Sequence, residues 1–113
     1  MNTATQPAPR LSVVIPVYNE EESLTPLADK LIAVFDRLPF AAEVIFVDDG
    51  STDRSFAVIA SLHQRDPRFR AVGFRRNYRK AAALAAGFRE AQGEYVLTMD
   101  AELQDDPEEI PRL

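Results

Sequence analysis

The sequence predicts an α/β domain with a mostly parallel sheet and helices on both of its faces. Three observations predict this class. Short apolar runs rich in β-branched residues recur along the chain, segments with helical spacing of apolar residues separate them, and no internal repeat or low-complexity tract breaks the alternation. Alternating strands and helices are typical of crossover units, in which successive strands run parallel.

Four runs are the expected strands. The first two, "LSVVIPV" (11–17) and "EVIFVDD" (43–49), are almost continuously apolar in their centres. That pattern is typical of strands that are buried on both faces. The third and fourth expected strands are "FRAVGF" (69–74) and "EYVLTM" (94–99).

The segment after the first strand predicts a helix, because its apolar residues fall at helical spacing. These residues are Leu24, Leu27, Leu31, Val34, Phe35 and Leu38. Asn19, with Glu22 three positions later, resembles a capping box in which the two side chains satisfy backbone N–H groups at the start of that helix.

Two further helices and a final turn complete the alternation. Ser51 or Thr52 is expected to cap the second helix, which ends near Pro67. An Ala-rich helix over 78–91 is expected to pack closely on the sheet, and "PEEIPRL" (107–113) begins a helix or turn.

Composition sets the limits on function. With 113 residues, 46% hydrophobic and 27% charged, the chain has room for one globular domain. Its net charge of −5 argues against nucleic acid as a partner, and the absence of cysteine excludes disulfides, thiolate metal sites and cysteine nucleophiles. No apolar run reaches the roughly 18 residues of a spanning helix. We expect a disordered leader over 1–10, a single domain over 11–113 and a cytoplasmic location.

Polar residues collect where each expected strand ends. In open parallel sheets, ligands bind beyond the carboxyl ends of the strands. The residues at those ends are Pro16, Tyr18, Asn19 and Glu20, then Asp48 and Asp49, then Arg75, Arg76 and Asn77, and finally Asp100, Glu102 and Gln104. This edge of the sheet is therefore the expected binding site.

Two common phosphate-binding schemes do not fit this edge. Neither G-x-G-x-x-G nor a Walker loop occurs, and three glutamates in the first helical turn would repel a phosphate. A divalent cation held by carboxylates would attract one instead, and Mg²⁺ or Mn²⁺ prefers oxygen ligands. Asp100 and Glu102 point the same way in an extended segment, and Gln104 adds a neutral oxygen. A solvated acidic turn is the alternative interpretation.

Four motifs in order, "VVIPVYNEEESL", "VIFVDDGSTDRS", "RRNYRKAAALAAGF" and "VLTMDAELQDDPEEIP", resemble the family 2 glycosyltransferases of GT-A fold. The subgroup that they most resemble transfers a sugar to dolichyl or another polyprenyl phosphate. The resemblance implies a UDP- or GDP-linked sugar donor, Mg²⁺ or Mn²⁺, and a polyprenyl-phosphate acceptor at the cytoplasmic face of a membrane. It assigns nucleotide binding to Pro16, Tyr18, Glu20, Asp49, Lys80 and Asp100. It assigns metal binding to Asp100, Glu102 and Gln104.

The sequence departs from the subgroup at two positions. Glu102 stands where an aspartate is usual, and Arg79 stands where glycine is common, so Arg79 either crowds its loop or adds a phosphate contact. Family members continue into an acceptor-binding half, so the catalytic base is expected beyond Leu113. The expectation is thus the donor-binding half of a transferase.

Several alternatives remain open from the sequence alone. The acceptor could be a polysaccharide or another glycan, and the chain could be a non-catalytic nucleotide-binding fragment. Asp49 could be only a helix cap. The basic residues between Arg65 and Lys80 could be solvated or could contact phosphate or anionic lipid. An uncovered fourth strand would favour dimers or other self-association.

Overall fold

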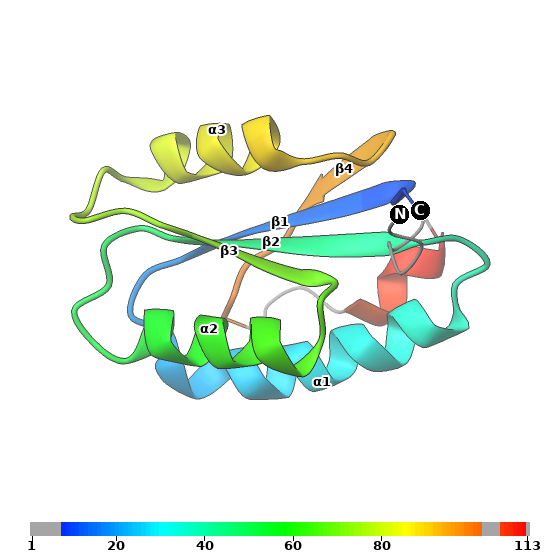
Figure 1. The fold of residues 1–113 in the computed structure, drawn as a ribbon, viewed down its shortest axis with the longest axis horizontal. Coiled ribbons are helices and arrows are strands. Elements are labelled where there is room, and N and C mark those ends of the chain that lie inside the picture. The colour runs from blue at the N-terminus through cyan, green and yellow to red at the C-terminus, as the bar shows by residue number, and fades with distance from the viewer. Residues whose placement is uncertain (1–7, 103–106, 113) are drawn as a thin grey trace, which may run out of the picture.

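In the computed structural model, residues 8–102 and 107–112 are described. The elements, in chain order, are β1 (Leu11–Val17), α1 (Glu21–Arg37), β2 (Ala42–Asp48), α2 (Ser55–Arg65), β3 (Phe69–Gly73), α3 (Lys80–Glu90), β4 (Tyr95–Thr98) and the 3₁₀ helix η1 (Pro107–Arg112). Within this part of the chain, four parallel strands form one sheet in the order β3-β2-β1-β4. Figure 1 shows α1 and α2 on one face of the sheet and α3 on the other. The predicted α/β class is confirmed.

The central strands β1 and β2 have apolar side chains on both faces, and each face has its own apolar cluster. Alternation along β1 places Val13, Ile15 and Val17 in the cluster under α1 and α2, and Val14 in the cluster under α3. The buried face of α1 consists of Leu24, Leu27, Ala28, Leu31, Val34 and Phe35. Full burial of one such large side chain contributes about 1.5–3 kcal/mol, so these two clusters hold the layers together.

Helix α3 lies very close to the sheet, as its composition predicts. Its buried residues are Ala83, Ala86 and Gly87. A Cβ at Gly87 would lie 2.3 Å from Cγ1 of Val14, so only glycine fits at this contact. The small residues thereby bring the N-terminus of α3 to the carboxyl ends of β1 and β4.

The predicted capping box of α1 is wrong. Asn19 has a φ of 53°, in the left-handed region that asparagine tolerates, and its side chain crosses to the next loop. Asn19 Oδ1 accepts the N–H of Thr52 at 2.8 Å and that of Asp53 at 3.3 Å. In return, Asn19 donates its own N–H to Ser51 Oγ at 2.9 Å. The two loops are adjacent because β1 and β2 are paired, and contacts between them replace the local cap.

The predicted cap of α2 by Ser51 or Thr52 is wrong as well. The residue before α2 is Arg54, and Asp53 Oδ1 accepts the N–H of Ser55 at 2.8 Å. Ser55 Oγ in turn accepts the N–H of Glu20 at 2.8 Å. The first residue of α2 therefore also provides the hydrogen-bond acceptor for the backbone N–H just before α1, and this contact fixes the β1–α1 loop at the edge of the sheet.

The strand and helix bounds differ from the predicted runs by one or two residues. Strand β2 ends at Asp48, β4 ends at Thr98, and α3 begins at Lys80 rather than at Tyr78. Strand β4 is an edge, with Tyr95 57% and Val96 41% exposed. Among the described helices, none has the length and apolar character needed to cross a membrane.

The predicted leader, 1–10, lies mostly outside the described residues. Its last residue is tied to the sheet, since Arg10 donates its N–H to the carbonyl of Ala41 at 2.8 Å and accepts the N–H of Tyr95 at 2.9 Å. Ordered structure therefore begins before Leu11.

Candidate functional site

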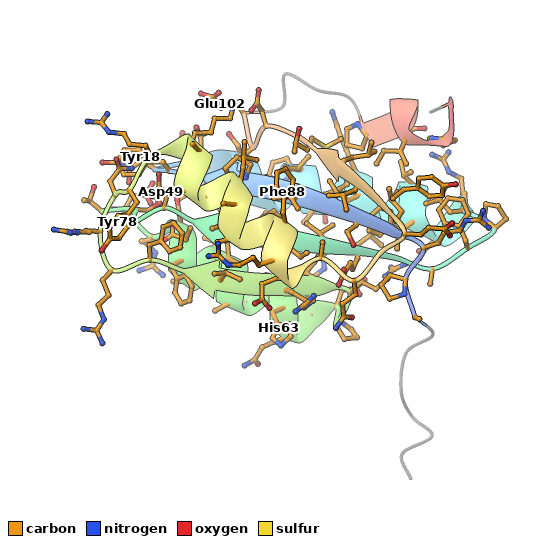
Figure 2. All side chains as sticks on the ribbon, turned by 90° about the horizontal axis from the view of Figure 1, so that it is seen from above. Tyr18, Asp49, His63, Tyr78, Phe88 and Glu102 are labelled. Carbon is orange, nitrogen blue, oxygen red and sulfur yellow. The ribbon has the colours of Figure 1, made fainter. Side chains whose placement is uncertain are left out.

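A cavity of about 400 Å³ opens at the carboxyl ends of β1, β2 and β4, beside the N-terminus of α3. Seven of the eight residues predicted to bind nucleotide or metal line this cavity: Pro16, Tyr18, Glu20, Asp49, Lys80, Asp100 and Glu102. Figure 2 shows Tyr18, Asp49, Tyr78 and Glu102 at the same end of the molecule, around the start of α3. Gln104, the remaining predicted residue, lies outside the described residues. Four strand ends and loops that are far apart in sequence thus meet at one hollow.

Asp49 fixes the loop between β3 and α3. Its side chain is nearly buried, at 4% exposed. Oδ1 accepts the N–H of Tyr78 at 2.7 Å, and Oδ2 accepts Asn77 Nδ2 at 3.0 Å. The interpretation of Asp49 as a helix cap is therefore wrong, because its partners belong to a different loop. A carboxylate offers about four acceptor positions, so further acceptor capacity remains for a ligand.

Gly50 makes this arrangement possible. Its φ is 72°, and a Cβ there would lie 2.1 Å from the carbonyl carbon of Arg76. The β2–α2 loop and the β3–α3 loop therefore touch backbone to backbone next to Asp49. Tyr78 is held further by an edge-on contact with Phe74, with 5.5 Å between ring centroids.

Asp48 does not take part in the cavity, although the sequence places it at the same edge. It is 3% exposed, and its Oδ1 has no hydrogen-bond partner in the described part of the chain. Burial raises the pKa of Asp48, and the charges of Asp53 and Asp49 add to this effect against opposing hydrogen bonds from Ser51. Of the adjacent pair, Asp49 is the residue with access to a ligand.

The acidic wall of the cavity consists of Glu20, Asp100 and Glu102. The pKa of Glu20 is raised, first by burial and then by the charge of Glu102 and a hydrogen bond with it. The carboxyl groups of Glu20 and Glu102 therefore lie close together, although Glu20 follows β1 and Glu102 follows β4. Such a pair favours either a shared proton or a cation.

Another part of the cavity lining is basic. Lys80, the first residue of α3, pairs with Asp100 at 3.2 Å between Nζ and Oδ1. Arg79 precedes it and also lines the cavity. The helix N-terminus adds partial positive charge at the same place. An anion and a cation could consequently be bound side by side here.

The donor set fits a hard divalent cation that shares its coordination with a ligand. The described residues include no group of three or more His, Cys, Asp and Glu residues that could hold a metal ion. Mg²⁺, however, is often held by only one or two carboxylates, with phosphate and water completing its shell. Asp100 and Glu102 supply those two carboxylates within the cavity.

The sequence model of the family described as "Glycosyl transferase family 2" matches residues 12–113. The chain belongs to glycosyltransferase family 2. The match runs through every strand and every loop that borders the cavity.

Two curated relatives carry the same enzyme name. The chain is 45% identical over 109 residues to an undecaprenyl-phosphate 4-deoxy-4-formamido-L-arabinose transferase of Yersinia pestis, covering 96% of this chain and 33% of the relative. An enzyme of the same name from Edwardsiella ictaluri is 48% identical over 104 residues, covering 91% and 32%. The chain thus spans about a third of the length of the curated relatives it matches.

Solved structures of nucleotide-sugar enzymes share the fold. A Pyrobaculum calidifontis mannosyltransferase in complex with GDP-mannose and Mn²⁺ superposes with a TM-score of 0.73 at 31% identity, covering 83% of this chain and 28% of that one. Residues 1–349 of S. aureus TarS in complex with UDP-GlcNAc superpose with a TM-score of 0.76 at 25% identity, covering 91% and 29%. The expected GT-A type of α/β fold is confirmed.

The sequence places Asn77 at the binding edge without a specific role and gives Arg79 a phosphate contact as only one of two alternatives. Asn77 lines the cavity and is also held by Asp49, and Arg79 lines it next to Lys80. Their signal in the sequence is their position directly after the third strand. Only the β3–α3 loop geometry shows that this segment folds back to the cavity.

Proposed function

We propose that this chain binds the nucleotide-sugar donor of a glycosyltransferase at the cavity beyond β1, β2 and β4. The observation that carries the proposal is the convergence of seven predicted residues on one cavity at the carboxyl edge of a family 2 domain. Its volume of about 400 Å³ lies within the ordinary range of small-molecule sites.

The base and ribose are placed on the Tyr18 and Asp49 side. Tyr18 is 45% exposed at the cavity wall, where its ring can stack on a base. Asp49 is held rigidly by Asn77 and Tyr78, so its carboxylate is preorganised to accept an N–H of the base. Pro16 and Glu20 border the same region.

The diphosphate is placed between the two charged walls. Asp100 and Glu102 would hold Mg²⁺ or Mn²⁺, and Gln104 is proposed as a further oxygen ligand. The cation supplies Lewis-acid stabilisation of charge on the departing diphosphate. Lys80, now paired with Asp100, is positioned to contact a phosphate from the α3 side.

The complete enzyme is proposed to transfer the sugar to a polyprenyl phosphate at the cytoplasmic face of a membrane. Support comes from the curated relatives, whose name specifies undecaprenyl phosphate. Because this chain spans about a third of their length, donor binding is the step that it can be tested for directly.

Titration of the chain with UDP and GDP in the presence of Mg²⁺, followed by NMR or calorimetry, tests the proposal. We expect saturable binding of one nucleotide that shifts resonances of the cavity residues. Tyr18→Ala should weaken it about fivefold or more, since base stacking contributes roughly 1–3 kcal/mol. Tyr95→Ala, at the other end of the sheet, is the matched control and should bind normally. Absence of binding, or equal effects of both variants, would contradict the proposal.

A further inference from the structure

Arg79 has a backbone conformation that is nearly exclusive to glycine. Its φ is 84° and its ψ is 164°. This region is costly for a residue with a Cβ, and such strain persists only where the surrounding structure holds it. Within the described residues, Asn19 is the other non-glycine residue with positive φ, and its side chain has partners that explain it.

The residues on both sides of Arg79 are fixed. Asp49 binds the N–H of Tyr78 and the side chain of Asn77, as described above. On the other side α3 begins, and the carbonyl of Arg79 accepts the N–H of Ala83 at 3.2 Å. The chain must therefore turn within one residue, and Arg79 takes up the strain.

The side chain of Arg79 is a cavity residue without a partner in the part of the chain that the structure describes. It lines the cavity together with Lys80, but no ion pair or side-chain hydrogen bond engages it there. Several other arginines of the described residues are engaged. Arg68 and Arg70 each bind two carboxylates, and Arg76 lies 4.8 Å from the centroid of the Tyr78 ring.

We propose that Arg79 binds the diphosphate of the nucleotide and determines how tightly this cavity holds it. A guanidinium binds phosphate oxygens through two parallel hydrogen bonds, which Lys80 cannot do. Asp100 and Glu102, which line the same cavity, would hold the cation, so the diphosphate would contact both the cation and Arg79. The strained backbone is the cost of presenting that arginine at the start of α3. This inference rests on the proposed nucleotide binding.

Three variants test it: Arg79→Gly removes both strain and charge, Arg79→Ala removes only the charge, and Arg75→Ala removes a charge from the same loop outside the cavity. Melting temperatures and affinities for UDP, GDP and the parent nucleosides are measured for each. Arg79→Gly should melt about 4 °C or more above the wild type, because the strain is relieved. Arg79→Gly and Arg79→Ala should both bind the diphosphate about tenfold or more weakly, with nucleoside affinity nearly unchanged.

The outcomes separate this inference from the proposed function. If the wild type binds UDP or GDP and Arg79→Gly binds it equally well, the inference is overturned and the proposed function stands. An equal loss of nucleoside affinity would overturn it too, because Arg79 would then act on the whole cavity. If the wild type binds neither nucleotide, both are overturned. A similar loss in Arg75→Ala would show a general charge effect, which also contradicts a specific role for Arg79.

Discussion

Asp49→Asn should weaken both the fold and nucleotide binding. In the wild type, one carboxylate oxygen accepts the N–H of Tyr78 at 2.7 Å and the other accepts Asn77 Nδ2 at 3.0 Å. An asparagine keeps one of these acceptors and turns the other into a donor that faces a donor. Loss of one charge-assisted hydrogen bond at a nearly buried site costs about 1.5–3 kcal/mol. At about 4 °C per kcal/mol, the melting temperature should fall by about 6–12 °C.

Thermal melting and nucleotide titration of the same samples measure the two effects. Asp29→Asn is the matched control, because Asp29 is in an exposed pair with Arg65, at 2.6 Å, that should contribute little. If the Asp49 carboxylate also accepts an N–H of the base, nucleotide affinity should fall by a further 1.5–3 kcal/mol or so. Asn77→Ala combined with Asp49→Asn should cost less than the sum of the two single changes, since both remove the same contact.

An unchanged melting temperature of Asp49→Asn would refute the reasoning about the loop. A lower melting temperature with unchanged nucleotide affinity would refute the contact with the base and leave Asp49 as a purely structural residue.

Three further predictions concern the fold. Gly87→Ala should lower the free energy of unfolding in urea by up to about 2 kcal/mol. Overpacking against Val14, at 2.3 Å, costs about 1–3 kcal/mol and outweighs a helix-propensity gain of about 1 kcal/mol, so a more stable variant would contradict this. Burial alone would raise the pKa of Glu43, but hydrogen bonds from Ser12, Gln92 and Arg70 lower it. The unfolded chain therefore binds more protons at this residue, and the free energy of unfolding should fall as the pH drops through the range of glutamate titration. Melting temperatures of the wild type and Glu43→Gln at pH 6 and pH 3 should show a smaller effect of acid in the variant. Val96→Lys on edge strand β4 should reduce self-association, measured by sizing chromatography. If the wild type associates and the variant elutes at the same volume, this edge is not the contact.

The sequence predicts the layers of this fold well because the strongest local patterns and the packing agree. The runs 11–17 and 43–49 are apolar on both faces, and they form the two central strands. The positions of the predicted cavity residues follow from the same reasoning, since the carboxyl ends of parallel strands meet at one edge.

Contacts between loops could not be predicted in this way. The local sequence around Asn19 predicts a cap for the helix that follows it. The pairing of β1 with β2 instead places Asn19 beside Thr52, and its side chain accepts the N–H of Thr52 in place of the local cap. Asp48 and Asp49 are equivalent as neighbours in sequence. Both are buried, and only the folded structure shows that Asp49 lines the cavity and Asp48 does not. The strain at Arg79 arises because Tyr78 before it and α3 after it are both held in place. Tyr78 is held by Asp49, which lies about thirty residues away in sequence.

The central claim is that a cation held by Asp100 and Glu102 attaches the nucleotide diphosphate to this cavity. Calorimetric titration of UDP and GDP, with Mn²⁺ and then with excess chelator, tests it most directly. We expect the affinity for the bound nucleotide to fall about tenfold or more in chelator. Glu102→Gln should lose much of the Mn²⁺ effect, whereas Glu94→Gln, at the opposite end of β4, should keep it. Equal affinity with Mn²⁺ and with chelator would contradict the claim.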